Sequence, residues 1–221
     1  MTRAAEAGRR PERNYRQYCG LAAALDAVGE RWTLLVVREL TLGPRRYSEL
    51  LADLPGIGTN LLAERLKKLR SLGVVRRVRC ADGGHSYELD EAGESLRESI
   101  AALARWGMPR LGDISDQGAV RAHWGFFAVA SMADATRLPG VRETYEFRVD
   151  DEVFHLRVAD GAASAVRGPA ESPALTATVD ATTFARIGAR VLTPAEATAQ
   201  GALAVTGDPG AVQRCSAVLG L

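Results

Sequence analysis

The pattern of apolar and polar residues divides this 221-residue chain into two parts. In the first part, apolar residues recur every three or four positions, in short runs that glycine or proline ends, which predicts short helices. In the second part, from Arg142, apolar and polar residues alternate over several short runs, which predicts strands. The three helical runs that open the chain are "LAAALDAV", "ERWTLLVVREL" and "RYSELLADL", at residues 21–28, 30–40 and 46–54.

A fourth helix is predicted over "TNLLAERLKKLRS", with Thr59 placed to cap its first turn. Its leucines fall on one face, so that face is expected to be buried. The opposite face carries Lys67 and Lys68, which are the only lysines in a chain with 26 arginines. The apolar positions of this helix are Leu62, Leu66 and Leu69.

After Gly73 the period of the pattern changes to two. "VVRRVRC" and "HSYEL" alternate on either side of the turn "ADGG", which predicts a β-hairpin. Asp90 is then placed to cap a long helix that runs to Leu111 and is expected to help the protein dimerise. Helices followed by a hairpin and a further helix are the order of a winged helix-turn-helix, in which the helix before the hairpin lies in the major groove of DNA.

Charge supports a nucleic-acid partner for this part of the chain. Residues 31–80 hold eleven basic and four acidic side chains, and the net charge is +5 up to Gly112 and −4 beyond it. The alternative is that the two lysines only keep an exposed helix face soluble. Base edges are expected to contact Asn60, Glu64 and Lys67, with the Glu64 carboxylate able to accept from a cytosine amino group. Phosphates and the minor groove are expected to contact Arg45, Ser48, Thr59, Lys68, Arg77, Arg79 and His85.

The second part predicts an α+β domain, in which an antiparallel sheet has helices on one face. "RETYEFRV", "VFHLRVA", "AASAVRG" and "ALTATVD" predict a meander of about four strands. "LTPAEATAQG" has Thr193 and Glu196 at the spacing of a capping box, and "ALAVTGD" predicts a last strand before a helix capped by Asp208. The predicted divisions are a flexible arm at 1–18, the winged helix-turn-helix at 19–112, a connecting helix at 113–141 and a small-molecule-binding domain at 142–221.

Aromatic side chains gather in this second domain and just before it. A pocket lined by several of them, with a few polar groups, would bind a flat or apolar ligand. The alternative for each aromatic residue is ordinary core packing, and for a histidine it is a place on the surface. The candidate ligand contacts are Trp106, His123, Trp124, Phe127, Tyr145, Phe147, Phe154 and Phe184.

The first part resembles the HxlR family of bacterial transcriptional regulators. The resemblance is carried by "ALDAVGERWTLLVVREL", "GPRRYSEL", "LPGIGTNLLAERLKKL" and "YELDEAG", in this order, and covers about Cys19 to Trp106. It implies a winged helix-turn-helix similar to that of MarR-type proteins. It also implies a homodimer that binds a pseudo-palindromic operator in double-stranded DNA.

The second part resembles the sterol carrier protein type-two-like fold. The resemblance is carried by "VFHLRVADGAASAVRG", "ALTATVDATTFARI" and "PAEATAQGALAVTGDPGAV", over about Arg142 to Leu221. Domains of this fold hold apolar molecules between a sheet and its helices. The resemblance therefore implies an apolar or aromatic small-molecule effector as a second partner.

The cysteines suggest a reducing compartment. Cys19, Cys80 and Cys215 are odd in number and far apart, which argues against a disulfide framework, and the chain has neither a signal-peptide pattern nor an apolar run that could span a membrane. A cytoplasmic location without membrane contact is therefore expected. HxlR-like proteins usually have Cys-Pro where this chain has Cys19-Gly20, and some members of the family sense oxidants or electrophiles through that thiol. With Arg16 nearby, Cys19 is either a redox-sensing thiol or an inert packing residue.

Motifs of catalysis and of cofactor binding are absent from the sequence. It contains no GxGxxG, GxxxxGK[ST], HExxH, CxxC or GxSxG, and its three histidines lack metal-ligand spacing. No enzyme, no cofactor and no metal site are therefore expected. The favoured function is a DNA-binding regulator, such as a repressor, whose operator binding responds to an apolar ligand. The alternatives are a thiol-sensing regulator that acts through Cys19, or a small-molecule carrier that uses its helix-turn-helix for protein contacts.

Overall fold

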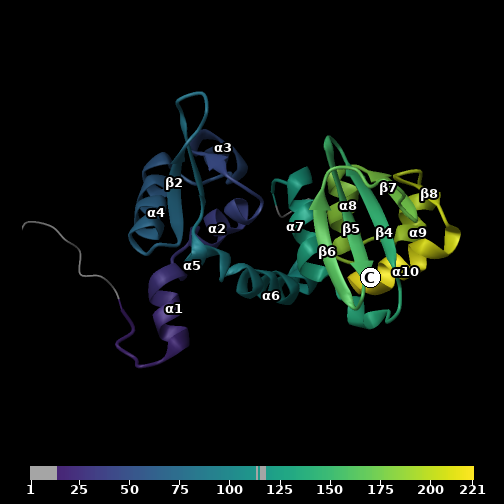
Figure 1. The fold of residues 1–221 in the computed structure, drawn as a ribbon, viewed down its shortest axis with the longest axis horizontal. Helices are drawn as coiled ribbons and strands as arrows, with labels where there is room; N and C mark the ends of the chain where they lie inside the picture. The colour runs from purple at the N-terminus through teal and green to yellow at the C-terminus, as the bar shows by residue number, and fades with distance from the viewer. Residues whose placement is uncertain (1–13, 113, 115–117) are drawn as a thin grey trace, which may run out of the picture. The chain divides into compact units, whose positions relative to one another are not determined.

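The computed structural model describes residues 14–112, 114 and 118–221, so most of the predicted N-terminal arm lies outside the described residues. The chain divides into two compact units, which meet in sequence between Ser95 and Leu96 (Figure 1). Each unit is described by itself. The sequence boundary predicted near Gly112 falls inside the second unit and stays a prediction.

The first unit is a set of helices beside a small antiparallel sheet. Its strand order is β1-β3-β2, so the short β1 extends the predicted hairpin by one strand. Leucines and valines from α2, α3 and α4 fill the core, as the helical spacing predicts. The elements are α1 (Gly20–Val28), α2 (Thr33–Thr41), β1 (Arg45–Arg46), α3 (Tyr47–Asp53), α4 (Thr59–Ser71), β2 (Val75–Arg79), β3 (His85–Leu89) and α5 (Glu91–Glu94).

Two predicted helix starts differ from the structure. The second helix begins at Thr33 because the backbone of Trp32 is left-handed, with φ 76°. The prediction that Thr59 caps the fourth helix is wrong, since Gly58 is the N-cap and Thr59 is the first helical residue. Thr59 instead accepts a hydrogen bond at its carbonyl oxygen from the Tyr47 hydroxyl, at 2.6 Å. This bond joins the start of α3 to the start of α4.

The long helix predicted from Asp90 to Leu111 is broken. Asp90 caps α5 as predicted, by accepting from the Glu91 N–H, but α5 ends at Glu94 and a new helix begins at Arg97. At the break the Ser95 hydroxyl donates to the Ala92 carbonyl, which is the local bond by which serine competes with a continuous helix. The break coincides with the boundary between the two units.

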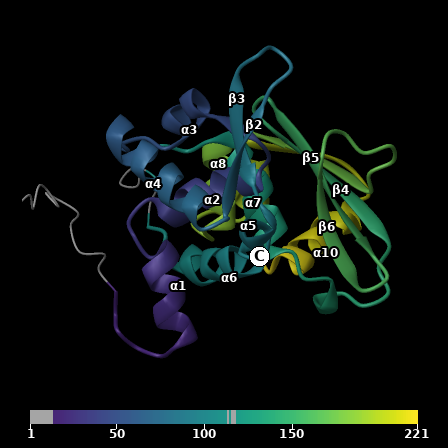
Figure 2. The same ribbon diagram turned by 60° about the vertical axis from the view of Figure 1, so that its left-hand side comes forward.

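The second unit is a five-stranded sheet with helices. Its elements are α6 (Arg97–Gly107), η1 (Met108–Arg110), α7 (Ala122–Met132), η3 (Ala135–Arg137), β4 (Glu143–Val149), β5 (Glu152–Ala159), β6 (Ala162–Arg167), β7 (Leu175–Val179), α8 (Ala181–Gly188), α9 (Pro194–Ala199), β8 (Leu203–Gly207) and α10 (Pro209–Leu219) (Figures 1 and 2). The predicted caps of α9 and α10 at Thr193 and Asp208 are both present, and Asp180 caps α8.

The strand order β6-β5-β4-β7-β8 corrects the predicted meander. β4, β5 and β6 do form one, but β7 lies beside β4 and runs parallel to it. A loop at residues 168–174 carries the chain from β6 to β7. Its N–H groups donate to the Val153 and Thr144 carbonyls and to the Glu146 carboxylate, each at 2.8 Å. These bonds hold the loop to the strands that it crosses.

Glu146 is the buried charged residue of this sheet, with 2% of its surface exposed. Burial raises the pKa of its carboxyl, but the hydrogen bonds from the Ala170 N–H and from Arg148 outweigh burial and leave the pKa below its usual range. The neighbouring residues of β4, Tyr145 and Phe147, point to the opposite face, as strand alternation requires. That face packs against side chains of α7, α8 and α10 to form the core.

Candidate functional site

Three polar residues occupy the exposed face of α4. Asn60, Glu64 and Lys67 are spaced by four and three positions, which aligns them along one side of a helix. All three are exposed, while the leucines of the other face are buried. This face therefore has donors and acceptors of both signs available to an outside partner.

The two lysines lie in different surroundings. Lys68 is half-buried, and its Nζ donates to the Asp26 carbonyl at 2.8 Å and lies 3.6 Å from the Glu30 carboxylate. It thus ties α4 to α1 and the residues that follow it. Lys67 is exposed, and within the part of the chain that the structure describes it has neither a hydrogen bond nor an ion pair. Lys67 is thus available to a partner such as DNA, whereas a DNA contact of Lys68 would compete with these bonds.

Glu64 shares its carboxylate with a neighbour. Arg65 Nη1 lies 2.9 Å from Glu64 Oε1 and 2.7 Å from the Glu30 carboxylate, and Arg65 Nε donates to the Arg31 carbonyl at 3.1 Å. The Glu64 side chain is nevertheless 68% exposed. Its second oxygen is thus available to accept from a base.

The hairpin presents further basic side chains. Arg77 and Arg79 are two residues apart on β2, so they share a face, and both are exposed. His85 is exposed opposite Arg79 across the hairpin. Arg76, by contrast, is paired with Glu88 at 2.6 Å. An ion pair between Arg46 and Asp82 anchors the turn of the hairpin to β1, and the Arg46 hydrogen bond holds the pKa of Asp82 below its usual range.

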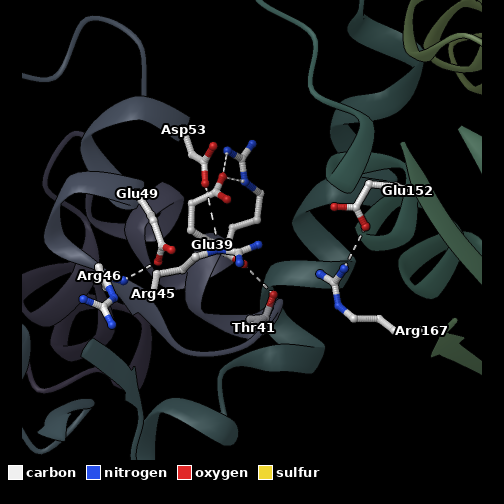
Figure 3. A network of polar contacts seen from close by, with 9 residues as sticks. Glu39, Thr41, Arg45, Arg46, Glu49, Asp53, Glu152 and Arg167 are labelled. Atoms are coloured by element: carbon white, nitrogen blue, oxygen red, sulfur yellow. Dashed lines mark hydrogen bonds and ion pairs between the residues drawn. The ribbon is translucent and has the colours of Figure 1, made fainter. Parts of the chain in front are cut away.

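The remaining predicted DNA contacts are close in the chain to the starts of α3 and α4, and Figure 3 draws Arg45 among them. Ser48 and Thr59 are exposed, whereas Arg45 is half-buried, with its Nε 3.9 Å from the Asp53 carboxylate. The Arg46 N–H donates to Glu49 at 2.6 Å and so caps α3. Arg45 thus lies near the carboxylate at the end of α3, and a contact of its guanidinium with a phosphate would compete with Asp53.

The second unit contains an apolar cavity of about 90 Å³. Strands β4, β7 and β8 form one wall, and helices α7, α8 and α10 form the others. The lining residues are Met108, Ala128, Val129, Met132, Phe147, Leu175, Ala177, Val179, Phe184, Ile187, Gly188, Pro194, Leu203, Val205, Val212, Cys215, Ser216, Leu219 and Leu221. Almost all of these side chains are apolar, so the cavity suits an apolar ligand.

Two of the eight predicted ligand contacts, Phe147 and Phe184, line this cavity. Phe154 lies behind them, stacked on Phe147 with ring centroids 5.4 Å apart, and Tyr145 is fully buried elsewhere in the core. Trp106 is 63% exposed on α6. The other three, His123, Trp124 and Phe127, are half-buried on α7 and are not among the lining residues.

The edge of the sheet is fastened to α7 by a charged residue. Arg167 on β6 lies 3.0 Å from the Glu152 carboxylate on β5 (Figure 3), and its guanidinium lies over the Phe126 ring at 4.8 Å. Phe126 in turn packs edge-on against Phe154. Together these contacts hold the aromatic wall of the cavity in place.

Sequence reasoning missed several residues that the structure brings to these sites. Tyr47 positions α4 through its bond to Thr59, and Met108, Cys215 and Ser216 line the cavity. Tyr47 lies inside the motif "GPRRYSEL", so that motif was the available signal. The cavity residues belong to distant segments, and a single sequence carries no signal that they meet.

Cys19 is exposed at the N-cap of α1. The backbone N–H groups of Ala22 and Leu21 lower the pKa of its thiol. Cys80 is half-buried in the hairpin and Cys215 is buried. The helix start, rather than the expected Arg16, is thus the cause of the lowered pKa at Cys19.

Comparison with known proteins assigns both halves of the chain. The family model described as HxlR-like helix-turn-helix matches residues 27–114, and the model described as SCP-2 sterol transfer family matches residues 127–220. The HTH-type transcriptional regulator YvaP of Bacillus subtilis is 34% identical over 85 residues, which are 38% of this chain and 79% of YvaP. The chain belongs to the HxlR-like helix-turn-helix family.

Other HxlR-like relatives match the same part of the chain. The HTH-type transcriptional regulator MT3179 of Mycobacterium tuberculosis is 44% identical over 86 residues, or 38% of this chain, and the match spans about half of that relative, 54% of its length. The crystal structure of a regulator named ytcD is 31% identical, with a TM-score of 0.39, and the match covers 42% of this chain and 96% of that one.

The two family matches separate the two sites almost completely. Every predicted DNA contact lies within the HxlR-like residues 27–114, and all of the cavity residues but Met108 and Leu221 lie within the SCP-2 residues 127–220. Met108 is in the HxlR-like match and lines the cavity of the SCP-2 part. No helix among the described residues is long and apolar enough to cross a membrane.

Proposed function

We propose that this protein is a dimeric, cytoplasmic transcriptional regulator that binds operator DNA, and that an apolar small molecule in its second unit changes its affinity for that DNA. The observation that carries the proposal is the exposed face of α4. It presents an amide, a carboxylate and an unpaired lysine on the helix before a basic hairpin. The curated relatives support this proposal because they are named as transcriptional regulators and not as enzymes.

In this proposal α4 enters the major groove and the hairpin follows the backbone. Asn60 and Lys67 read base edges, and Glu64 accepts from a cytosine amino group with the oxygen that Arg65 leaves open. Arg77, Arg79 and His85 contact phosphates or the minor groove. Ser48 and Thr59 add neutral phosphate contacts, while Arg45 and Lys68 mainly hold the helices in register.

The first experiment measures DNA binding. Fluorescence anisotropy with labelled DNA from directly upstream of this protein's own gene, at two salt concentrations, should give tight binding that weakens as salt rises, since released counterions drive phosphate contacts. A scrambled duplex of equal length is the control. Equal affinity for both duplexes, or no binding to either, would contradict operator recognition and favour the carrier function with a protein-binding helix-turn-helix.

The two lysines form a matched pair for the second experiment. Lys67→Ala should weaken operator binding by roughly 1–3 kcal/mol if the side chain reads a base, or lower the salt slope by about 1 for each contact if it meets a phosphate. Lys68→Ala should leave the salt slope unchanged, because its ammonium is bonded to the Asp26 carbonyl. The reverse ranking in the same anisotropy assay would show that the wrong lysine has been assigned to DNA.

An apolar ligand is proposed because the cavity is lined almost wholly by carbon atoms. To change DNA affinity, the ligand must prefer one arrangement of the protein, and such couplings are typically about 1–3 kcal/mol. Titration with the neutral fluorophore N-phenyl-1-naphthylamine measures binding directly, since its emission rises in an apolar site. Phe184→Ala should change the affinity for the fluorophore while leaving DNA binding unchanged.

Dimerisation is proposed from exposed apolar residues on α1 and α6. Leu21 is 69% exposed and Trp106 is 63% exposed, and Tyr18, Leu25 and Leu103 are also exposed. Large apolar side chains gathered on a helix surface commonly mark an interface. Light scattering after size exclusion should give twice the mass of the 23.6 kDa chain, and Leu21→Asp should shift the mass toward the monomer.

A second candidate function rests on Cys19. An exposed thiol whose pKa is lowered by a helix start is the kind that reacts with oxidants and electrophiles. If this thiol is the sensor, an oxidant such as diamide should weaken operator binding in the wild type and not in Cys19→Ser. Unchanged DNA binding of the oxidised wild type would remove this candidate.

A further inference from the structure

We propose that Met108 is the residue through which a ligand in the cavity acts on the DNA-binding unit. The inference rests on the proposed function and adds to it the route of regulation. It starts from the position of Met108 in the chain. Met108 follows directly on α6, the first helix of the second unit, and the chain continues from α6 back into the first unit at Ser95.

Met108 packs closely against Gly188 in the cavity wall. A Cβ atom on Gly188 would lie 3.1 Å from the Met108 methyl group, which is tighter than ordinary van der Waals contact. The absence of a side chain at the end of α8 therefore lets the methionine approach this closely. The Met108 side chain occupies this place between α8 and the rest of the lining.

The cavity is too small for most ligands unless a wall residue moves. Its volume is about 90 Å³, which is smaller than an engineered cavity of about 150 Å³ that binds benzene or xenon. Phe147 belongs to a strand and is stacked on Phe154, so it has little room to yield. Methionine is unbranched and flexible, so Met108 and Met132 are the side chains that can be displaced most easily.

Of these two methionines, only Met108 is attached to the end of α6. Its N–H bonds to the Ala104 carbonyl, and Arg110 donates to the Trp106 carbonyl and stacks over the Trp106 ring at 3.7 Å. Pro109 prevents the helix from continuing. A ligand that displaces Met108 therefore pushes directly on the end of α6, the helix that follows the first unit in the chain. Met132 ends α7 and acts on α6 indirectly, through the hydrogen bond from Arg105 to the Ser131 carbonyl at 2.7 Å.

The test compares the two methionines in the full-length protein. The dissociation constant for labelled operator DNA is measured with and without saturating N-phenyl-1-naphthylamine, and the ratio is the coupling factor. A wild-type factor of about 5 or more is expected. Met108→Ala should bind both the fluorophore and the DNA yet bring the factor close to 1, while Met132→Ala should keep most of it.

A second variant perturbs Met108 without changing it. Gly188→Ala places a methyl group against the Met108 side chain and should shift the DNA affinity of the ligand-free protein in the direction that the fluorophore shifts the wild type. The fluorophore should then have less further effect. Thermal unfolding of each variant detects a folding defect. Met108→Leu, a variant of similar size, helps to distinguish such a defect from a loss of coupling.

The outcomes separate this inference from the proposed function. Coupling that survives in Met108→Ala, or that is lost equally in Met132→Ala, overturns the role of Met108 and leaves the ligand-responsive regulator standing. A wild type that binds fluorophore and DNA independently overturns ligand modulation itself, and the inference with it. Loss of coupling in Met108→Ala alone, with Gly188→Ala imitating the ligand, establishes the route.

Discussion

Cys19, Cys80 and Cys215 carry the same thiol in three different surroundings. Cys19 is exposed at a helix start whose N–H groups lower the pKa of the thiol. Cys215 is buried beside the cavity, and burial raises the pKa of its thiol to about 12. The ordinary value is 9.0, so burial keeps the Cys215 thiol protonated near neutral pH.

Iodoacetamide should therefore alkylate the three cysteines at different rates. At pH 7.5 Cys19 should be modified first and Cys215 last, because the thiolate is the nucleophile and burial also denies access. Mass spectrometry of peptides sampled over time would measure the three rates. In denaturant the rates should converge, and rapid labelling of Cys215 in the folded protein would contradict the buried position assigned to it.

The contacts of single side chains were also the features that the sequence predicted least well. The spacing of Asn60, Glu64 and Lys67 follows from helix geometry, so their common exposed face could be predicted. The different surroundings of Lys68 could not, because they depend on the Asp26 carbonyl, which lies 42 residues away in the chain. Periodicity specifies a face of a helix and not the element that packs beside it.

Among the secondary-structure elements, the short helix α5 depends on a glycine for its close packing. A Cβ atom on Gly93 would lie 2.2 Å from the Val74 carbonyl oxygen and 3.0 Å from the Leu89 side chain. α5 therefore packs directly on the backbone at the start of the hairpin. This explains the glycine in the motif "YELDEAG".

Gly93→Ala should destabilise the protein by about 1–3 kcal/mol, because a backbone oxygen cannot yield as a flexible side chain would. Chemical denaturation followed by circular dichroism measures the free energy of unfolding. Gly20→Ala is a suitable control, since it is also helical and has open space around it. Equal stability of both variants would show that α5 does not pack as described.

The predicted helices and strands were mostly right, because apolar spacing and caps are local properties. Thr193 and Asp208 both cap the helices for which they were assigned. The order of the strands is not local. β7 pairs with β4 because the loop before it is held by Glu146 and two carbonyl groups, and alternation along β7 gives no sign of its neighbour.

For the whole molecule, the carboxylates that hold helix ends make stability depend on pH. Hydrogen bonds from Thr193 lower the pKa of Glu196, and the ion pair with Arg214 lowers that of Asp208. At Asp180, burial raises the pKa, but the hydrogen bonds from Thr183 outweigh burial, so the pKa is lowered overall. Their ordinary values are 4.5 for glutamate and 3.8 for aspartate. Since each folded pKa is lower, the stability that these groups contribute is complete above those values and is lost as pH falls through the folded ones.

The denaturation midpoint should accordingly stay level from pH 7 to about 5 and fall below about 4. Asp180→Ala should lower it at neutral pH by removing a cap worth about 1 kcal/mol. Asp180→Asn keeps a capping oxygen without a titrating group, so it should show a weaker dependence on acid. A midpoint that rises on acidification would contradict the direction of these shifts.

The division of the chain into two dissimilar units was predictable from the change of period and charge along the sequence. The cavity was not, because its volume is what remains after α7, α8 and α10 meet the sheet. Phe147 and Phe184 were among eight candidate ligand contacts, and only packing separates them from Tyr145 and Phe154.

Because the sequence holds only two lysines, chemical labelling of side-chain amines is restricted to two positions. A reagent that acylates amines finds two side-chain targets in the sequence, and one of these, Lys68, already donates to a carbonyl. Of the two side-chain amines, a fluorescent dye attached through amine chemistry would therefore favour Lys67, in the middle of the helix proposed to enter the major groove. Labelling meant only to make the protein visible would block that surface, and bound operator DNA would in turn shield it from the dye.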